Sequence, residues 1–548
     1  MFTKFIDNKA PPEVEVLDTT LRDGAQAKDV SFDIQAKVRI ALALDQIGVH
    51  FIEAGWPGSN PKDELFFKEI KRYTLENAEI VAFTSTRRKG LSASQDPILE
   101  KVLDADTKWV TVFGKSWDLH VTEVLNTTLE ENLNMVYDTI KYLKENGRSV
   151  IFDAEHFFDG FKRNSEYAME VLRTAIEAGA DRIVLADTNG GMLPHEVYNV
   201  VRYVVEELPG VPIGVHMHND SGCAVANTVM GVVAGASHVH VTVNGIGERT
   251  GNADLCAVVP NLELKLGVRA LKNRDGLKML KQLSKLVYDL AGLKPNPYQP
   301  YVGDNAFAHK AGVHVDAILK NPVAYEHVPP ESVGNRRSLA ISELSGAANL
   351  IGWAKRELGL HLDKRDPAVR RALKRIKELE NEGYSFDNAV ASALLILLEE
   401  LGLRGKAFRM LDWRVISEGN EGGSKSWGMV KVGNGETYLE AEEGIGPVEA
   451  VEKALRKALK NVVPEVENVS LVDYRVHLPG VSKHTESDVR VEITFTDGKR
   501  LWTTTSVSRN IIEASLKALM EGIEYYVIRN KLEKIRGVLQ ANEEAPTL

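Results

Sequence analysis

A short β-branched run that ends in a polar residue recurs along residues 14–244, and a helical stretch follows each run. The eight runs are Val14–Asp18, His50–Glu53, Ile80–Ser85, Trp109–Phe113, Val150–Glu155, Arg182–Asp187, Ile213–His218 and His238–Asn244. Strands that alternate with helices predict a parallel sheet covered by helices. Such units, within about 250 residues, fit a closed (β/α)8 TIM barrel with its chemistry at the C-terminal ends of the strands. A doubly wound open sheet is the alternative, and the polar residue that closes nearly every strand favours the barrel.

The pattern changes after Pro260, and two further regions follow the expected barrel of residues 1–275. Residues 276–403 are mostly helical in pattern, with a proline-rich break at 294–301, and we expect linker subdomains that contribute to the active site. Residues 404–548 alternate like strands again, and their helical segments GPVEAVEKALRKAL and RNIIEASLKALMEG resemble each other. We interpret this region as a twofold strand–strand–helix repeat that forms a C-terminal α+β domain for regulation or dimerisation.

Composition narrows the classes of partner. Lys and Arg number 67 against 77 Asp and Glu, and the net charge of −10 argues against nucleic acid or an anionic membrane as the partner. The two cysteines, Cys223 and Cys256, cannot form a disulfide scaffold or a four-sulfur zinc site. The first residues lack the apolar segment of a signal peptide, and the longest apolar run, Ala389–Leu398, is far shorter than the ~20 residues of a membrane span. We therefore expect a soluble cytoplasmic protein.

Polar residues at two strand ends are candidates for a metal site. The first strand ends in LDTTLRDGAQ (17–26), which brings Arg22 and Asp23 to the barrel mouth, although an isolated Arg-Asp pair can also be a salt-bridged turn. The seventh strand carries VHMHND (215–220), and because strand side chains alternate, His216 and His218 point to the same side. Two imidazoles at this spacing are half of a metal site. Taken alone, the pair can equally be structural.

Other strands add polar groups to the same mouth. The eighth continues into NGIGERTGN (244–252), a tight loop that presents Glu248, Arg249 and Asn252, while Glu155 and Thr188 follow the fifth and sixth strands. One carboxylate, two imidazoles and nearby amide or water oxygens suit a divalent ion with open positions, acting as a Lewis acid on a carbonyl oxygen. Together with an arginine and a carboxylate base, this inventory favours carbonyl chemistry on an anionic oxo acid.

A second histidine pair provides a contrast. His238 and His240 lie on the eighth run, whose expected end is Asn244. At about 3.3 Å per residue, His240 would lie ~13 Å below the mouth. We therefore assign His240 to barrel packing.

Five motifs in order resemble the α-isopropylmalate, homocitrate and citramalate synthase family. They are DTTLRDGAQ (18–26), DTNGG (187–191), HMHND (216–220), NGIGERTGN (244–252) and AFAHKAGVHVDAILKNPVAYEH (306–327). The resemblance covers almost the whole chain. It implies a Claisen-type condensation of acetyl-CoA with a 2-oxo acid, followed by hydrolysis that releases CoA. Three further stretches, at 52–63, 113–121 and 153–160, most resemble the citramalate-forming branch, which uses pyruvate in isoleucine biosynthesis.

The resemblance also assigns roles to individual residues. The implied ligands of a divalent metal, with Mn, Mg, Zn and Co all open, are Asp23, His216, His218 and Asn252. Arg22 would lie beside the keto oxygen and stabilise charge there, and Thr188 would hydrogen-bond the carboxylate of the oxo acid. Glu155 would lie near the reacting carbon. His314 and Tyr325, from a segment that reaches over the partner subunit's barrel, would assist enolisation or activate the hydrolytic water.

The resemblance extends to regulation and to pocket size. The C-terminal repeat would form a homodimer and bind isoleucine as a feedback inhibitor. Family members that act on larger oxo acids usually carry Glu-Asp where this chain has Glu155-His156, followed here by Phe157 and Phe158. One hypothesis is that these bulky side chains shorten the pocket to fit pyruvate. The alternative is that both phenylalanines pack beneath the mouth.

Rival functions make different demands on the sequence. The nearest is 2-isopropylmalate synthase, which performs the same chemistry on 2-oxoisovalerate. A hydroxymethylglutaryl-CoA-type lyase would have a catalytic cysteine in the loop after strand eight, whereas NGIGERTGN has none before Cys256. A biotin-dependent carboxyltransferase would carry a Met-Lys-Met motif, which does not occur in the chain. A non-catalytic metal-binding scaffold would predict an incomplete set of ligands.

Overall fold

The computed structural model describes residues 8–309, 314, 317–318, 320–339, 347–405, 407–420, 423–479 and 487–543. These residues divide into two compact units. The first runs to Phe307 and includes Val328–Arg336, and the second comprises Ala308–His327 and the chain from Arg337 onward.

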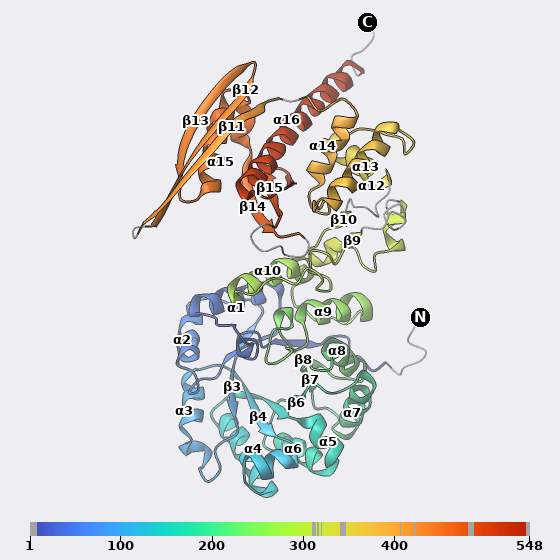
Figure 1. Ribbon diagram of the computed structural model, residues 1–548. Helices are drawn as coiled ribbons and strands as arrows, with labels where there is room; N and C mark the ends of the chain where they lie inside the picture. The colour runs from blue at the N-terminus through green and yellow to red at the C-terminus, as the bar shows by residue number, and fades with distance from the viewer. Residues whose placement is uncertain are drawn as a thin grey trace. The chain divides into compact units, whose positions relative to one another are not determined.

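The first unit is a closed barrel of parallel strands in the order β1 to β8, with β8 paired to β1 (Figure 1). The strands are β1 (Glu15–Asp18), β2 (Phe51–Gly55), β3 (Glu79–Ser85), β4 (Trp109–Lys115), β5 (Ser149–Glu155), β6 (Arg182–Asp187), β7 (Ile213–Met217) and β8 (His238–Val241). The (β/α)8 barrel expected from the sequence is therefore confirmed. Each of the eight predicted runs overlaps a strand, because short β-branched segments between helices are buried on both faces.

Helices surround the barrel. They are α1 (Ile34–Ile47), α2 (Pro61–Ile70), α3 (Pro97–Asp104), α4 (Leu129–Glu145), α5 (Phe157–Arg163), α6 (Ser165–Glu177), α7 (Pro194–Glu207), α8 (Ala224–Val233), α9 (Leu255–Pro260) and α10 (Leu280–Ala291). Local sequence fixes where several begin: the side chains of Asp33, Asn60, Asp96 and Thr128 accept hydrogen bonds from backbone N–H groups of the first turns. At the other end of α1, Gly48 has φ +93° and stops the helix.

An apolar layer crosses the barrel interior below its polar mouth. Toward the N-terminal ends of the strands, Leu17, Phe51, Val81, Ile151 and Val184 form a small separate cluster. Side chains alternate along a strand, so the residue two positions after each of these also faces inward. On β2 and β5 those residues are the carboxylates Glu53 and Asp153, both buried. The polar groups therefore lie above an apolar floor, at the end of the barrel where the loops leave.

The depth expected for His240 is wrong. Strand β8 ends at Val241 rather than at Asn244, and a short 3-10 turn (Val243–Gly245) follows it. The pairing of β7 with β8 places His240 directly beside His216. The sequence argument counted the turn residues as strand and so placed the side chain too deep.

The second unit begins with short elements and helices, namely β9 (Ala308–His309), β10 (Ser338–Leu339), α12 (Ala347–Trp353), α13 (Pro367–Asn381) and α14 (Val390–Glu400). Two sheet-and-helix motifs follow. They are β11 (Arg409–Asn420), β12 (Gly423–Asn434), β13 (Glu436–Gly444) and α15 (Pro447–Lys460), then β14 (Ser470–His477), β15 (Val489–Thr496), β16 (Leu501–Ser508) and α16 (Ile511–Glu543). Each sheet is an antiparallel meander. No helix in the described part of the chain is long and apolar enough to cross a membrane.

The repeat has one strand more than expected. The sequence interpretation was strand–strand–helix, whereas each motif contains three strands before its helix. The strand missed is β13, with the sequence ETYLEAEEG. Four of its nine residues are glutamates, and they fall on both faces of the strand, so their charges obscure the period of two that identifies a strand.

Candidate active site and metal centre

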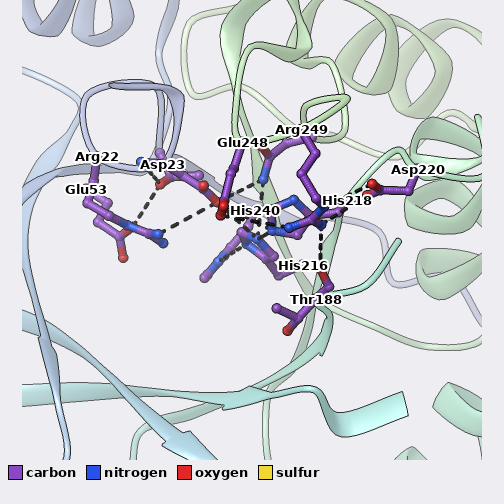
Figure 2. A network of polar contacts seen from close by, with 12 residues as sticks. Arg22, Asp23, Glu53, Thr188, His216, His218, Asp220, His240, Glu248 and Arg249 are labelled. Carbon is purple, nitrogen blue, oxygen red and sulfur yellow. Dashed lines mark hydrogen bonds and ion pairs between the residues drawn. The ribbon is translucent and has the colours of Figure 1, made fainter. Parts of the chain in front are cut away.

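Four of the sequence-predicted residues converge at the C-terminal end of the barrel, and Figure 2 labels three of them, Asp23, His216 and His218. Asp23 Oδ2 lies 3.2 Å from His216 Nε2 and 3.9 Å from His218 Nε2. The two imidazole Nε2 atoms are 3.3 Å apart. The side-chain nitrogen of Asn252 is 2.9 Å from Asp23 Oδ2 and 3.3 Å from His216 Nε2. One carboxylate, two imidazoles and an amide therefore face a common point, and all four side chains are buried.

Two loops and one strand hold these groups, since Asp23 and Asn252 lie in loops whereas His216 lies on β7 and His218 directly follows it. A tight turn after β1 directs Asp23 inward, and the backbone N–H groups of Asp23 and Gly24 both donate to Thr19 O. The loop after β8 depends on glycine. A Cβ atom on Gly247 would lie 1.8 Å from Asn252 Oδ1, and one on Gly251 would lie 1.9 Å from Gly245 O. Only glycine allows this loop to fold back closely enough to place Asn252 beside His218.

The charge states of these side chains are compatible with a bound metal cation. Burial alone would raise the pKa of Asp23, but Arg22 and the imidazoles of His216 and His218 overcome it and hold that pKa far below its ordinary value. Burial, and then the neighbouring His216, lower the pKa of His218 to about 4, which leaves its imidazole neutral near pH 7. An ionised carboxylate and a neutral imidazole are the forms that bind a metal ion.

An unpaired atom supplies a further test of fit. The Oδ1 atom of Asn252 is buried and has no hydrogen-bond partner among the described residues. Buried polar atoms normally have one. Rotation of the Asn252 amide would turn this oxygen toward the point that Asp23 and the two histidines face. A divalent ion at that point could bind the oxygen. The donor set therefore fits a divalent cation bound by mixed N and O ligands.

Arg22 is held rigidly beside this group. Its Nε donates to Glu53 Oε2 at 2.6 Å, and its Nη1 lies 3.7 Å from Asp23 Oδ2. The guanidinium carbon lies 3.9 Å from the centre of the Phe83 ring. The same Glu53 oxygen accepts from the hydroxyl of Thr19 at 2.8 Å. A guanidinium group fixed in this way is preorganised to stabilise negative charge that develops beside it.

Three motifs are tied together at the rim of the mouth. Arg249 binds both carboxylate oxygens of Asp220, at 2.9 and 3.0 Å, and also donates to the backbone carbonyl of Thr188 at 2.7 Å (Figure 2). The hydroxyl oxygen of Thr188 accepts the backbone N–H of His156 at 2.8 Å. That bond orients the hydroxyl and leaves its own proton free to donate to a ligand. The loops after β5, β6, β7 and β8 are thereby connected.

Glu155 at the end of β5 forms an ion pair with Lys115 at the end of β4. The register of the two strands places these residues opposite each other. Both side chains are largely, but not fully, buried. Glu155 therefore lies at the mouth of the barrel, with the ammonium group of Lys115 beside its carboxylate.

The phenylalanines that follow do not reach the mouth. Phe157 and Phe158 are fully buried in the core of the first unit, and their rings pack edge to face at the start of α5. The structure thus supports the packing alternative and contradicts the hypothesis that these side chains shorten the pocket. The ring next to Glu155 is His156, whose φ of +59° turns it toward His120, with ring centres 4.1 Å apart.

The remaining two predicted residues belong to the second unit. His314 and Tyr325 stack on each other with ring centres 4.2 Å apart, and both are exposed. Next to them, Glu326 binds Arg337 through both carboxylate oxygens, at 2.6 and 2.5 Å. The structure brings His314 and Tyr325 together, and their action on a partner's barrel remains a prediction.

Sequence reasoning missed several residues of the site: Glu53, Lys115, Asp153, Asp220 and His240. Glu53 and Asp153 carried a usable signal, because each lies two residues after an inward apolar residue on its strand. Lys115 and His240 did not, since their places depend on the register of one strand against the next.

Family models match most of the chain. Residues 13–287 match the HMGL-like family, residues 301–384 the homocitrate synthase post-HMGL domain-like family, and residues 389–527 the LeuA allosteric (dimerisation) domain. The class is therefore an HMGL-like barrel joined to a LeuA regulatory domain.

Curated relatives narrow this class. The chain is 56% identical to an (R)-citramalate synthase of Sulfolobus acidocaldarius, over 97% of this chain and 99% of the relative. It is 48% identical to an (R)-citramalate synthase of Aquifex aeolicus, over 95% and 99%. A probable 2-isopropylmalate synthase of Methanopyrus kandleri is 34% identical, over 95% and 100%. The chain belongs to the (R)-citramalate synthase family.

Proposed function

We propose that this chain condenses acetyl-CoA with pyruvate and hydrolyses the product to citramalate and free CoA. The observation that carries this proposal is the convergence of Asp23, His216, His218 and Asn252 beside Arg22, in a chain of this family. These four side chains would hold a divalent cation, which when bound supplies a Lewis acid for the oxygens of the oxo acid. Mn, Mg, Zn and Co all accept such a ligand set.

The chain's own residues account for binding and orienting pyruvate. The Thr188 hydroxyl, fixed by the N–H of His156, donates to the carboxylate of pyruvate. The guanidinium of Arg22, held by Glu53, faces the keto oxygen and stabilises the negative charge that forms there. The keto carbon is thereby fixed and polarised for attack.

The reaction proceeds in two stages. A base removes a proton from the acetyl methyl group, and the resulting enolate forms a C–C bond to the keto carbon, whose oxygen gains a proton and becomes the hydroxyl. Water then attacks the thioester carbonyl, the C–S bond breaks, and CoA leaves as the thiol. Glu155, which forms an ion pair with Lys115, and the stacked pair His314 and Tyr325 supply the base and activate the water.

Regulation is assigned to the C-terminal domain. We propose that two chains form a homodimer through it and that isoleucine, the end product of the pathway, binds there and inhibits turnover. The match to an allosteric (dimerisation) domain supports this assignment. Inhibition by isoleucine with little effect of leucine is expected, and inhibition by leucine alone would contradict it.

The deciding experiment measures CoA release from acetyl-CoA with pyruvate, 2-oxoisovalerate or 2-oxoglutarate, before and after chelation. Turnover with pyruvate, lost on chelation and restored by a divalent ion, is the expected result. Preference for 2-oxoisovalerate would keep the barrel and its metal but move the activity to isopropylmalate formation. No CoA release with any oxo acid would refute the synthase function.

A further inference from the structure

The imidazole of His216 has two nitrogens, and each faces a different group. Its Nε2 faces Asp23 at 3.2 Å and the Nε2 of His218 at 3.3 Å, so this is the nitrogen available to an ion. Its Nδ1 lies 3.2 Å from Nδ1 of His240 on the neighbouring strand. The two rings are nearly perpendicular, at 89°, and both are buried.

The tautomers follow from this geometry. A histidine that binds a metal ion through Nε2 carries its proton on Nδ1 and needs an acceptor for that proton. Across the described residues, the hydrogen-bond partner of His216 Nδ1 is His240 Nδ1. The His240 Nδ1 atom must then be unprotonated, and the proton of the neutral ring lies on Nε2, which is buried without a hydrogen-bond partner among the described residues.

We propose that His240 is a positioning residue, which accepts the Nδ1–H hydrogen bond of His216 and thereby fixes the tautomer and ring orientation that expose Nε2 to the metal. The inference rests on the proposed metal-dependent function and deepens it. Partners of this kind typically contribute 10- to 100-fold to metal affinity, because they remove the freedom of a ligand to rotate or change tautomer.

The rival explanation is a second cation lower in the barrel. Nitrogen atoms of His216 and His240 and an oxygen of Asp153 all lie within 4.8 Å of one another. In that case His240 would itself be a ligand, and the chain would bind two ions instead of one.

Three variants separate these explanations. His240→Leu removes the acceptor, whereas His240→Asn retains an oxygen where Nδ1 lies. His238→Leu is the matched control, because His238 is equally buried on the same strand but faces Glu15, at 3.6 Å. If His240→Leu does not fold, as judged by circular dichroism, His240→Met replaces it as a side chain closer in size.

The measurement is calorimetric titration of the chelated full-length protein with Mn²⁺, and the visible absorption spectrum of the Co²⁺ form. We expect one ion per chain, a Kd raised about 10- to 100-fold in His240→Leu, and Kd values close to wild type in His240→Asn and His238→Leu. The Co²⁺ spectrum should change only in His240→Leu. Equal weakening by His240→Leu and His238→Leu, an unchanged Kd in His240→Leu, or two ions per wild-type chain would each overturn the proposal. Absence of any Mn²⁺ binding by the wild type would overturn the metal-dependent function as well.

Discussion

The barrel mouth buries charged side chains, whereas the first sheet of the second unit exposes apolar ones. At the mouth, the carboxylates of Asp23 and Glu53 are buried, at 2% and 0% exposure, and each has a cation beside it. On the sheet of β11, β12 and β13, large apolar side chains are exposed instead: Ile416 by 60% and Leu439 by 57%. Buried charge is costly and persists where it positions chemistry. Exposed apolar surface of this kind is typical of a surface that contacts another chain.

The largest expected effect, on turnover, comes from removing the buried charge of Asp23. Asp23→Asn removes the only carboxylate of the four-residue group, so turnover should fall at least ~10³-fold even with excess metal. The control is Glu79→Gln, at the start of β3 and paired with Lys108 on the opposite end of the barrel. Steady-state CoA release measures both. Similar losses in the two variants would show that the effect is on folding.

A second substitution tests whether the geometry of the Arg22 guanidinium contributes to catalysis beyond its positive charge. Arg22→Lys keeps the charge but loses the Nε contact to Glu53 and the stacking on Phe83, so kcat should fall about 10²-fold. The matched control is Arg148→Lys, which lies outside the site and pairs with Asp106. Wild-type kcat in Arg22→Lys would show that charge alone is sufficient.

A third prediction tests the exposed surface. Ile416→Asp places a charge on the open face of the sheet, where a partner would bury it, and should weaken the homodimer about 100-fold. Leu65→Asp, on exposed helix α2, is the control. Light scattering coupled to size-exclusion chromatography, over a dilution series, gives the dimer dissociation constant. An unchanged constant in Ile416→Asp would place the interface elsewhere.

A fourth prediction concerns the half-buried carboxyl of Glu521 in the second unit. Burial raises the pKa of Glu521 to about 7, although the hydroxyl of Ser392 and the cation of Arg404 oppose this, while Glu524 and Glu399 add repulsion. The unfolded chain releases this proton near pH 4.5 and the folded chain only near pH 7, so the free energy of unfolding should fall as pH rises between these values.

Glu521→Gln removes that dependence. Above pH 7 the variant should be more stable than the wild type by about 1–3 kcal/mol, reduced by the partial exposure of the side chain, and near pH 5 the two should be alike. Urea unfolding monitored across this pH range is the measurement. A gap that is constant with pH would show that Glu521 does not titrate in this range.

The smallest expected effect tests whether Phe157 contributes only to core packing or also to the choice of oxo acid. Phe157→Leu should cost about 1–2 kcal/mol of stability because the ring is fully buried. The ratio of kcat/KM for pyruvate to that for 2-oxoisovalerate should stay unchanged. A shift of this ratio toward the larger oxo acid would instead indicate that the Phe157 ring lines the substrate pocket.

Much of the site could be predicted because its signals are local. The metal group depends on short motifs: alternation brings His216 and His218 to one side, and Asn252 ends a loop that glycines force to turn back. The parts that could not be predicted depend on pairing between strands. Lys115 meets Glu155, and His240 meets His216, only because of the register of two neighbours, and an error of three residues in the end of β8 was enough to displace His240.

The hydrophobic core of the second unit limits how this protein can be recombined with its relatives. Leu394 and Leu397 on α14 pack in the same core as Trp502 and Leu516, and Ser392 on that helix hydrogen-bonds Glu521 on α16. A chimera joined at residue 404, between α14 and β11, would therefore separate one side of a continuous core from the other. Exchange of effector specificity between family members should instead move the helices from Ala347 onward together with both sheets, as a single cassette.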